Sequence, residues 1–399
     1  MKPVQLAALA GVAGIILVGG YSLVAQRQAT TATVGAARGL FLSDFALVAD
    51  QAASVTIRKN AADLVLTKQG DGWVLPSKGG YAADGARVRD GLRALADSQI
   101  IEAKTSKPEL YSRLSVEDPD APGSASTLVT VADAQGKPLA SVIVGRRQLE
   151  AGASESEPRN FVRRQGEALS YLVGGEFRFE ADAKEWMVRS VGDLKPERVR
   201  AVRAELAGAP VAEISRPSAN DTKYTLANQP EGRTLKDEFV LTRLANALAG
   251  VTFDDVAKAQ EAGTDAPEAH VLKVSCFDGL LIEARGVKKL DAWWWSLHAG
   301  FEAPPTPPAD ASPKAEDGTQ AGGAPTAVTE PSDDLKAEIE RLNQAWNGWA
   351  FRLPTFKSTQ MAPSLEDLLA PLPKVEAPKP ETGSPAPAGD DNGPLALPK

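Results

Sequence analysis

Residues 55–75 read VTIRKNAADLVLTKQGDGWVL, a stretch in which apolar and polar residues alternate with the period of β-strands. Apolar residues then recur at helical spacing from Val88 to Leu95, and the short run Gln99–Ile101 follows them. Asp84 stands where a helix N-cap would accept backbone hydrogen bonds. This order predicts a module made of an antiparallel strand meander, one packed helix and a closing strand.

The same order of strands, helix and strand recurs twice further along the chain. The second copy has strands within 202–226, a helix over 241–248 and a strand at 251–253, and the third has strands within 272–297, a helix over 333–346 and a strand at 349–351. Thr234 and Asp237 resemble a capping box before the second helix. We therefore expect three copies of one small module.

A strand meander is also expected between the first two copies. Alternating apolar runs at 128–131, 139–144, 161–164 and 169–173 are separated by turn residues, which predicts an antiparallel sheet. The expected fold class is thus α+β, with an N-terminal transmembrane helix followed by repeated mixed modules. The boundaries are an anchor at 1–27, a first module at 28–104, a β-rich middle module at 105–192, a second repeat at 193–262, a third repeat at 263–370 and a tail at 371–399.

The N-terminal run Val4–Ala25 is apolar except for Gln5 and Ser22, and it is long enough to cross a bilayer as a helix. It is either a membrane anchor or a signal peptide. Leu23 stands three positions before any cut after Ala25, where a secretory signal would carry a small residue, so we favour an uncleaved single-pass anchor. The charges that flank the run give only a weak indication of its orientation.

Two glycines of this run are candidate partner contacts within the membrane. Gly11 lies four residues after Ala7, and Gly14 lies four residues after Ala10, a spacing that lets another helix approach closely in lipid. The alternative is that small residues are simply common in such helices.

Composition and motifs exclude several classes of binding protein. The formal net charge is −8 and no stripe of Lys and Arg is present, which argues against nucleic acid. No Gly-rich loop ending in Lys and Ser or Thr is found, so no nucleotide is expected. With two histidines and one cysteine in 399 residues, we expect no metal and no cofactor. Glu117, Asp118 and Asp120 form an acidic turn without the ligand spacing of a calcium loop.

No catalytic residue is predicted, and the protein is expected not to be an enzyme. Cys276 lies in an alternating strand and is interpreted as a small buried apolar residue. A thiol nucleophile would need His270 or His298 as its base, and a glycosidase would need two carboxylates that meet only in space. Neither alternative has a motif in its support.

The aromatic run Trp293–Trp295 is the best soluble candidate for partner binding. On a strand Trp293 and Trp295 share one face and Trp294 takes the other. Trp294 is therefore the candidate partner contact, the alternative being that both faces are packed in the core.

Two segments have the composition of disordered chain. Residues 302–332 and 371–399 are rich in Pro, Ala, Gly and acidic residues, which cannot bury enough apolar surface to offset the entropy of ordering. They are interpreted as flexible spacers, and the alternative is that they are flexible segments that dock onto a partner.

These features together resemble a known bacterial family. The matching stretches are Gly72–Leu75, Tyr81–Asp84, Ser126–Val131 with Gly136, Val144–Gly145, Asn160–Arg163 with Gly166, Glu185–Trp186, Trp293–Trp295, Gly348–Phe351 and Glu366–Leu369. Over roughly residues 50 to 370 the chain is similar to the domain of unknown function 4340 family, found beside ABC transporters of the gliding-motility type. The family often has Pro where this chain has Ala82.

The resemblance implies an inner-membrane protein of the bacterial envelope with its body in the periplasm. It also implies an auxiliary component of an ABC-type export or remodelling system, with an ABC-type permease or auxiliary subunit as its partner, and it brings no active site. The expected function is therefore that of a non-enzymatic accessory component acting through protein or cargo contacts. The alternative is an envelope scaffold or cell-wall-binding module that works without a transporter.

Overall fold

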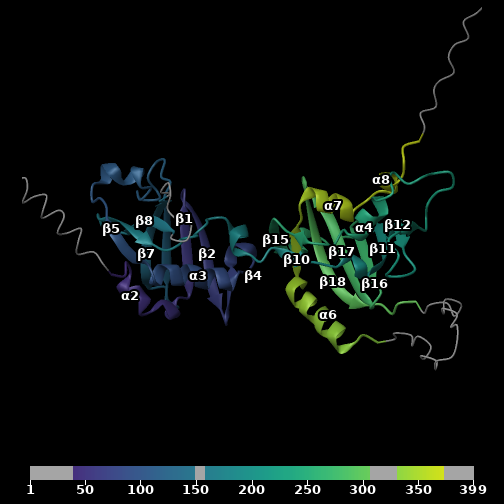
Figure 1. The fold of residues 1–399 in the computed structure, drawn as a ribbon, viewed down its shortest axis with the longest axis horizontal. Coiled ribbons are helices and arrows are strands. Elements are labelled where there is room, and N and C mark those ends of the chain that lie inside the picture. The colour runs from purple at the N-terminus through teal and green to yellow at the C-terminus, as the bar shows by residue number, and fades with distance from the viewer. Residues whose placement is uncertain (1–38, 149–157, 306–329, 373–399) are drawn as a thin grey trace, which may run out of the picture.

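The computed structural model describes residues 39–148, 158–305 and 330–372. They form two lobes that lie side by side along the long axis of the molecule (Figure 1). A nine-stranded antiparallel sheet forms the first lobe and an eight-stranded antiparallel sheet the second, while β10 (Ser190–Gly192) and β14 (Val251–Thr252) pair by themselves.

The first lobe contains all nine strands of the larger sheet, in the order β4-β3-β2-β1-β6-β7-β8-β9-β5. Its strands are β1 (Ser54–Lys59), β2 (Ala62–Gln69), β3 (Gly72–Leu75), β4 (Tyr81–Ala82), β5 (Gln99–Ala103), β6 (Thr127–Ala132), β7 (Pro138–Arg147), β8 (Arg159–Arg164) and β9 (Ser170–Gly174). Its helices are α2 (Ser43–Ala46) and α3 (Gly85–Ala96). The closing strand β5 crosses to the far edge of the sheet and pairs with β9.

The alternation of apolar and polar residues along the strands builds the buried face of this sheet. Ile57 pairs with Leu64 on one side and with Val129 on the other, and all three side chains are buried. Helix α3 contributes Val88, Leu92 and Leu95 to the same core. The carboxylate of Asp84 accepts hydrogen bonds from the next helical amides, those of residues 86 and 87, so the predicted N-cap is confirmed.

The segment that follows β5 covers part of the opposite face of the sheet. Tyr111 and Val116 pack there on apolar side chains of β6 to β9, namely Leu128, Ile143, Phe161 and Leu172. Gly145 of β7 permits this crossing, because a Cβ at that position would lie 2.3 Å from the carbonyl oxygen of Leu114.

The second lobe has the strand order β13-β12-β11-β16-β17-β18-β19-β15. Its strands are β11 (Val199–Leu206), β12 (Ala209–Ser215), β13 (Thr225–Leu226), β15 (Asp255–Lys258), β16 (His270–Cys276), β17 (Leu280–Lys289), β18 (Ala292–Phe301) and β19 (Trp349–Arg352). Its helices are α4 (Val240–Ala245), α5 (Ala259–Ala262), α6 (Asp333–Trp346), α7 (Thr355–Met361) and α8 (Leu365–Leu368).

The two lobes share one topology. In each lobe a meander runs outward from a central strand, a helix follows, the next strand of the sheet crosses to the far edge, and a second meander starts beside that central strand. Thus β1, β5 and β6 of the first lobe correspond to β11, β15 and β16 of the second. The repeating unit is therefore a whole lobe, and the described part of the chain holds two copies of it.

Facing edges of the two sheets meet at the junction between the lobes (Figure 1). Tyr81 of β4 packs edge-on against Phe253, Trp349 and Phe351, with ring centroids 5.8, 4.9 and 6.2 Å away. Beside it, the ammonium of Lys78 lies 2.6 Å from the carboxylate of Asp255. Buried apolar side chains run from one lobe into the other as a single cluster.

The expected α+β fold class of three helix-bearing modules is wrong. The described chain is mostly antiparallel sheet with few helices, and the strands expected in separate modules share sheets. The helix expected over 241–248 is only the six-residue α4, and Asp237 pairs with Arg243 instead of forming the predicted capping box. The predicted middle meander and the helix over 333–346 are confirmed as β6 to β9 and α6. Periodicity located these elements, but their pairing partners lie far away in sequence.

Several predictions fall on residues outside the described ranges. They are the transmembrane helix at 1–27 with Gly11 and Gly14, most of the insertion at 302–332, and nearly all of the tail at 371–399. Among the helices of the described part of the chain, none has the length and apolar character needed to cross a membrane.

We predict that Tyr81→Ala weakens the junction between the lobes. The loss of a partly buried ring from an aromatic cluster should lower the free energy of unfolding by about 3 kcal/mol, and trypsin should cut the connection at 187–199 faster. Urea unfolding and timed proteolysis measure the two effects. Tyr81→Phe keeps the ring and is the matched control. Unchanged stability and cleavage of Tyr81→Ala would contradict this account of the junction.

Candidate functional site

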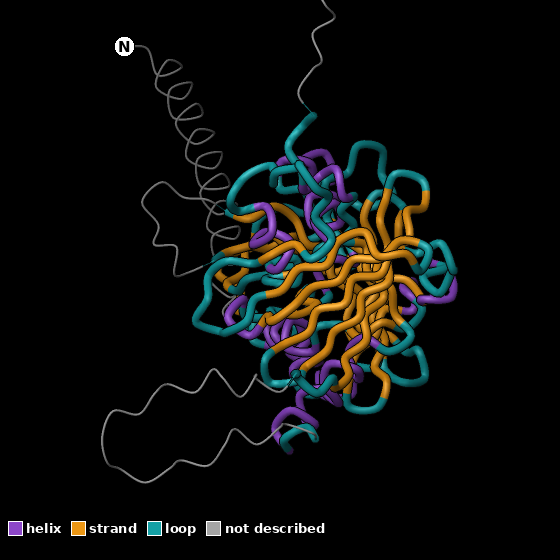
Figure 2. Tube along the Cα trace, turned by 90° about the vertical axis from the view of Figure 1, so that its right-hand side faces the viewer, coloured by secondary structure: helices purple, strands orange, loops and turns teal. Residues whose placement is uncertain are grey.

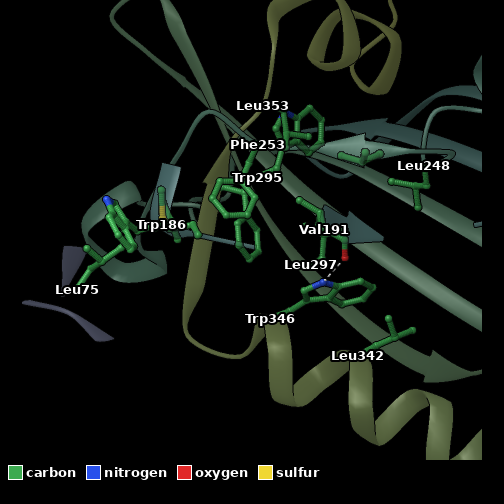
Figure 3. Close-up of a cluster of buried hydrophobic side chains, with 14 of the residues drawn as sticks. Leu75, Trp186, Val191, Leu248, Phe253, Trp295, Leu297, Leu342, Trp346 and Leu353 are labelled. Carbon is green, nitrogen blue, oxygen red and sulfur yellow. Dashed lines mark hydrogen bonds between the residues drawn. The ribbon is translucent and has the colours of Figure 1, made fainter. Parts of the chain in front are cut away.

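An apolar hollow in the second lobe is the best-formed candidate site. It has a volume of about 440 Å³ and lies between α6, the sheet and the β10–β14 pair. Its walls are formed by large apolar side chains, among them Val191, Leu248, Ile282, Leu297, Leu342 and Trp346 (Figure 3). Its size and lining are typical of small-molecule pockets, which span about 300–1,000 Å³.

Helix α6 forms one wall of this hollow and is held by specific bonds. The side chain of Asn343 accepts a hydrogen bond from the Ala299 amide and donates one to the Ala299 carbonyl, both at 2.8 Å. These bonds satisfy the backbone groups of Ala299, which lies in β18 beyond the last residue that pairs with β19. The indole N–H of Trp346 donates to the carbonyl of Val191 at 2.8 Å (Figure 3). These bonds attach α6 to β18 and β10 on two sides of the hollow.

Four charged residues stand among the lining of the hollow, and three of them are paired. The guanidinium of Arg198 binds both oxygens of Glu338 at 2.9 and 3.0 Å and also binds Asp278. Its pKa is raised, with the hydrogen bonds to Glu338 as the largest cause. Asp193 is paired with Lys195, and this hydrogen bond lowers the pKa of the carboxyl. Arg341 of α6 is exposed and has no ion pair within the described ranges.

The hollow depends on an element that the first lobe lacks. Helix α6 lies between β18 and β19, whereas β8 and β9 of the first lobe are joined by residues 165–169 alone. The duplicated topology therefore provides the sheet, and the inserted helix provides the second wall of the hollow.

The first lobe carries a broad charged groove beside α3. Two adjoining hollows of about 900 and 770 Å³ share Arg87, Glu176 and Arg178 in their lining. Glu176 is paired with Arg178 and Arg147, and Arg87 lies over the ring of Trp186 and near Glu185. Side chains of both signs of charge line the groove, so it favours no ligand of one charge.

The predicted tryptophan run is β18 residues 293–295. Trp295 is fully buried, stacks on Trp293 with ring centroids 5.6 Å apart, and covers Gly286, where a Cβ would lie 2.6 Å from the indole. Trp294 points to the opposite face of the sheet, beside Val287 and Arg352 in register, and is partly buried. The alternation predicted for the three indoles is therefore confirmed, whereas the role of Trp294 as a partner contact stays a prediction.

The predicted candidates for chemistry do not converge. Cys276 is 1% exposed, and burial, the largest cause, raises the pKa of its thiol to about 12. His270 lies at the other end of the same strand, and His298 points to the opposite face of the sheet. No cluster of three potential metal-binding side chains is found in the ranges that the structure describes.

The acidic turn at 117–120 is tied into the first lobe. Glu117 accepts a hydrogen bond from the Ala125 amide, Asp118 pairs with Arg163 at 2.8 Å, and Asp120 lies 3.5 Å from Arg58. Each of the three carboxylates thus contacts a different donor group.

Sequence reasoning missed the hollow under α6. The sequence predicted a helix over 333–346, but nothing in its pattern shows that Val191 and Leu248 would line a hollow with this helix. Those residues come from segments assigned to other modules.

Comparison with known proteins gives the family. The family described as "Domain of unknown function (DUF4340)" matches residues 73–273, which is just over half of the chain. The chain belongs to this family. No curated protein and no solved structure matches the chain.

We predict that Asn343→Ala loosens α6 without unfolding the lobe. The change leaves the backbone amide and carbonyl of Ala299 without their partners, which should cost about 2 kcal/mol. Hydrogen exchange of the α6 amides should accelerate by at least about tenfold. Gln344→Ala alters an exposed neighbour on the same helix and should leave the exchange unchanged. Equal exchange in both variants would show that Asn343 does not hold the helix.

We predict that the Cys276 thiol is inert in the folded chain. The aromatic disulfide reagent DTNB should modify no thiol at pH 8 and one thiol per chain in 6 M guanidinium, counted as released thiolate at about 412 nm, because the folded state holds the thiol buried and protonated. The pKa rises from 9.0 to about 12 on folding, so the thiol's contribution to stability is present below pH 9 and lost as the pH rises toward 12. Rapid labelling of the native chain would refute this.

Proposed function

We propose that this protein is a non-enzymatic, membrane-anchored accessory component of an ABC-type transport or envelope-remodelling complex, with its two lobes in the periplasm. The observation that carries the proposal is an uncovered sheet face in the second lobe. In Figure 2, which looks onto that lobe, strands occupy the centre of the view.

This face, called the outer face below, carries a row of polar residues in register across five strands. The row is Glu213, Arg203, Lys273, Glu283 and His298, on β12, β11, β16, β17 and β18. Each is exposed or partly exposed. Trp294 lies on the same face and strand as His298, two same-face positions farther along β18, with Ser296 and its partner Arg285 between them.

The position of the chain entry supports docking through the outer face. The described chain enters beside α2, at the end of the first lobe remote from the second (Figure 1). If residues 1–27 anchor the protein in the inner membrane, the second lobe extends farthest from the anchor. A partner that rises from the membrane, such as an ABC-type permease or an auxiliary subunit, can then contact both the anchor helix and the outer face.

Co-purification from the native membrane tests this proposal. The tagged full chain, extracted in mild detergent, should bring down an ABC-type ATPase and permease in stoichiometric amounts. Sedimentation of the chain with isolated cell wall, without these subunits, would contradict the proposal and favour a cell-wall-binding scaffold.

Two sets of variants locate the contacts. Gly11→Leu with Gly14→Leu should keep the chain in the membrane fraction and reduce recovery of the permease, because bulky residues prevent close helix approach.

Trp294→Ala should reduce recovery of the permease by about tenfold, as for an interface anchor, with little change in melting temperature. Phe356→Ala removes a 69% exposed ring from α7 and is the matched control. A large fall in melting temperature for Trp294→Ala would place this indole in the core instead.

A further inference from the structure

We propose that the hollow under α6 binds the hydrocarbon chain of an anionic amphiphile such as a fatty acid. This ligand site is separate from the outer face proposed for docking, since the hollow lies on the α6 side of the sheet. Its failure would leave the docking proposal intact.

The apolar part of the lining suits a hydrocarbon chain. No lining residue carries a buried side-chain nitrogen or oxygen that lacks a hydrogen-bond partner in the described structure. The one indole N–H at its wall, that of Trp346, already donates to Val191. Between Leu248, Ile282 and Leu297 a polar group would lose its hydration without finding a side-chain partner, whereas an alkyl chain buries apolar surface there.

The charges of the hollow select the sign of the head group. Arg198 and Glu338 neutralise one another, and Asp193 is neutralised by Lys195. Arg341 is the one lining charge without an ion pair among the described residues. Its guanidinium presents paired N–H donors, which match a carboxylate or a phosphate.

The hollow is open to a ligand without unfolding of the lobe. Val188, which is 59% exposed, and Ala345 of α6, which is also exposed, both line it. Arg341 lies one helical turn before Ala345 on α6. An anionic head group bound to Arg341 would therefore lie next to the exposed side of the hollow at Ala345, through which the alkyl chain enters.

Photolabelling of the full chain tests the site. A lysate that contains the tagged chain is illuminated with dodecanoate carrying a diazirine on its chain, and the captured protein is digested and mapped. The label should fall on peptides from 188–194 and 333–346, and unlabelled dodecanoate should compete it away. Dodecyltrimethylammonium, which has the same chain and the opposite charge, should compete less well.

Three variants make the test decisive. Ala345→Phe fills the hollow and should reduce labelling by about tenfold, while Ala337→Phe, on an exposed position of the same helix outside the lining, should label like the parent chain. Arg341→Ala should reduce labelling by about threefold and remove the preference over the cationic competitor. Equal labelling of Ala345→Phe and Ala337→Phe, or a label confined to residues that do not line the hollow, would overturn the site. Equal competition by both amphiphiles with the parent chain would overturn the anionic head group.

Discussion

The contact of Tyr81 with Phe253, Trp349 and Phe351 fixes how the two lobes stand relative to each other. Each sheet has an edge at this junction, and an exposed strand edge would be open to pairing with other chains. Aromatic packing and the ion pair between Lys78 and Asp255 cover these edges. The apolar cluster also continues across the junction, so the two lobes share one core.

Duplication explains most of the remaining architecture, and departures from it explain the candidate sites. In both lobes the strand that crosses to the far edge of the sheet, β5 after α3 or β15 after α4, requires a long crossover and a shared core. In the first lobe the segment after β5 covers part of one face with Tyr111 and Val116. In the second lobe the inserted α6 covers the opposite face and leaves the hollow beneath it, while much of the outer face stays open. The candidate surfaces of the second lobe therefore lie where its covering differs from that of the first lobe.

The two proposed activities use different physical properties of one sheet. The outer face bears charged residues in register and suits a polar, reversible contact, in which complementary charges set partner choice. The α6 side of the sheet holds a hollow lined mainly by apolar side chains, and suits a hydrocarbon ligand. Strand alternation separates the two, since neighbouring residues of β17 and β18 point to opposite sides.

The sequence by itself determined the local elements: the alternation that makes β1 to β3, the cap of Asp84 on α3, the length of α6, and the opposite directions of Trp294 and Trp295. These follow from periods of two and 3.6 residues and from short-range hydrogen bonds. Only the tertiary structure decided that β5 pairs with β9, that the chain holds two lobes instead of three modules, and that Val191, Leu248 and Leu342 enclose one hollow. Such contacts join residues tens to more than a hundred positions apart, and a strand that is apolar on one side can pair with many others, so periodicity does not specify its neighbour.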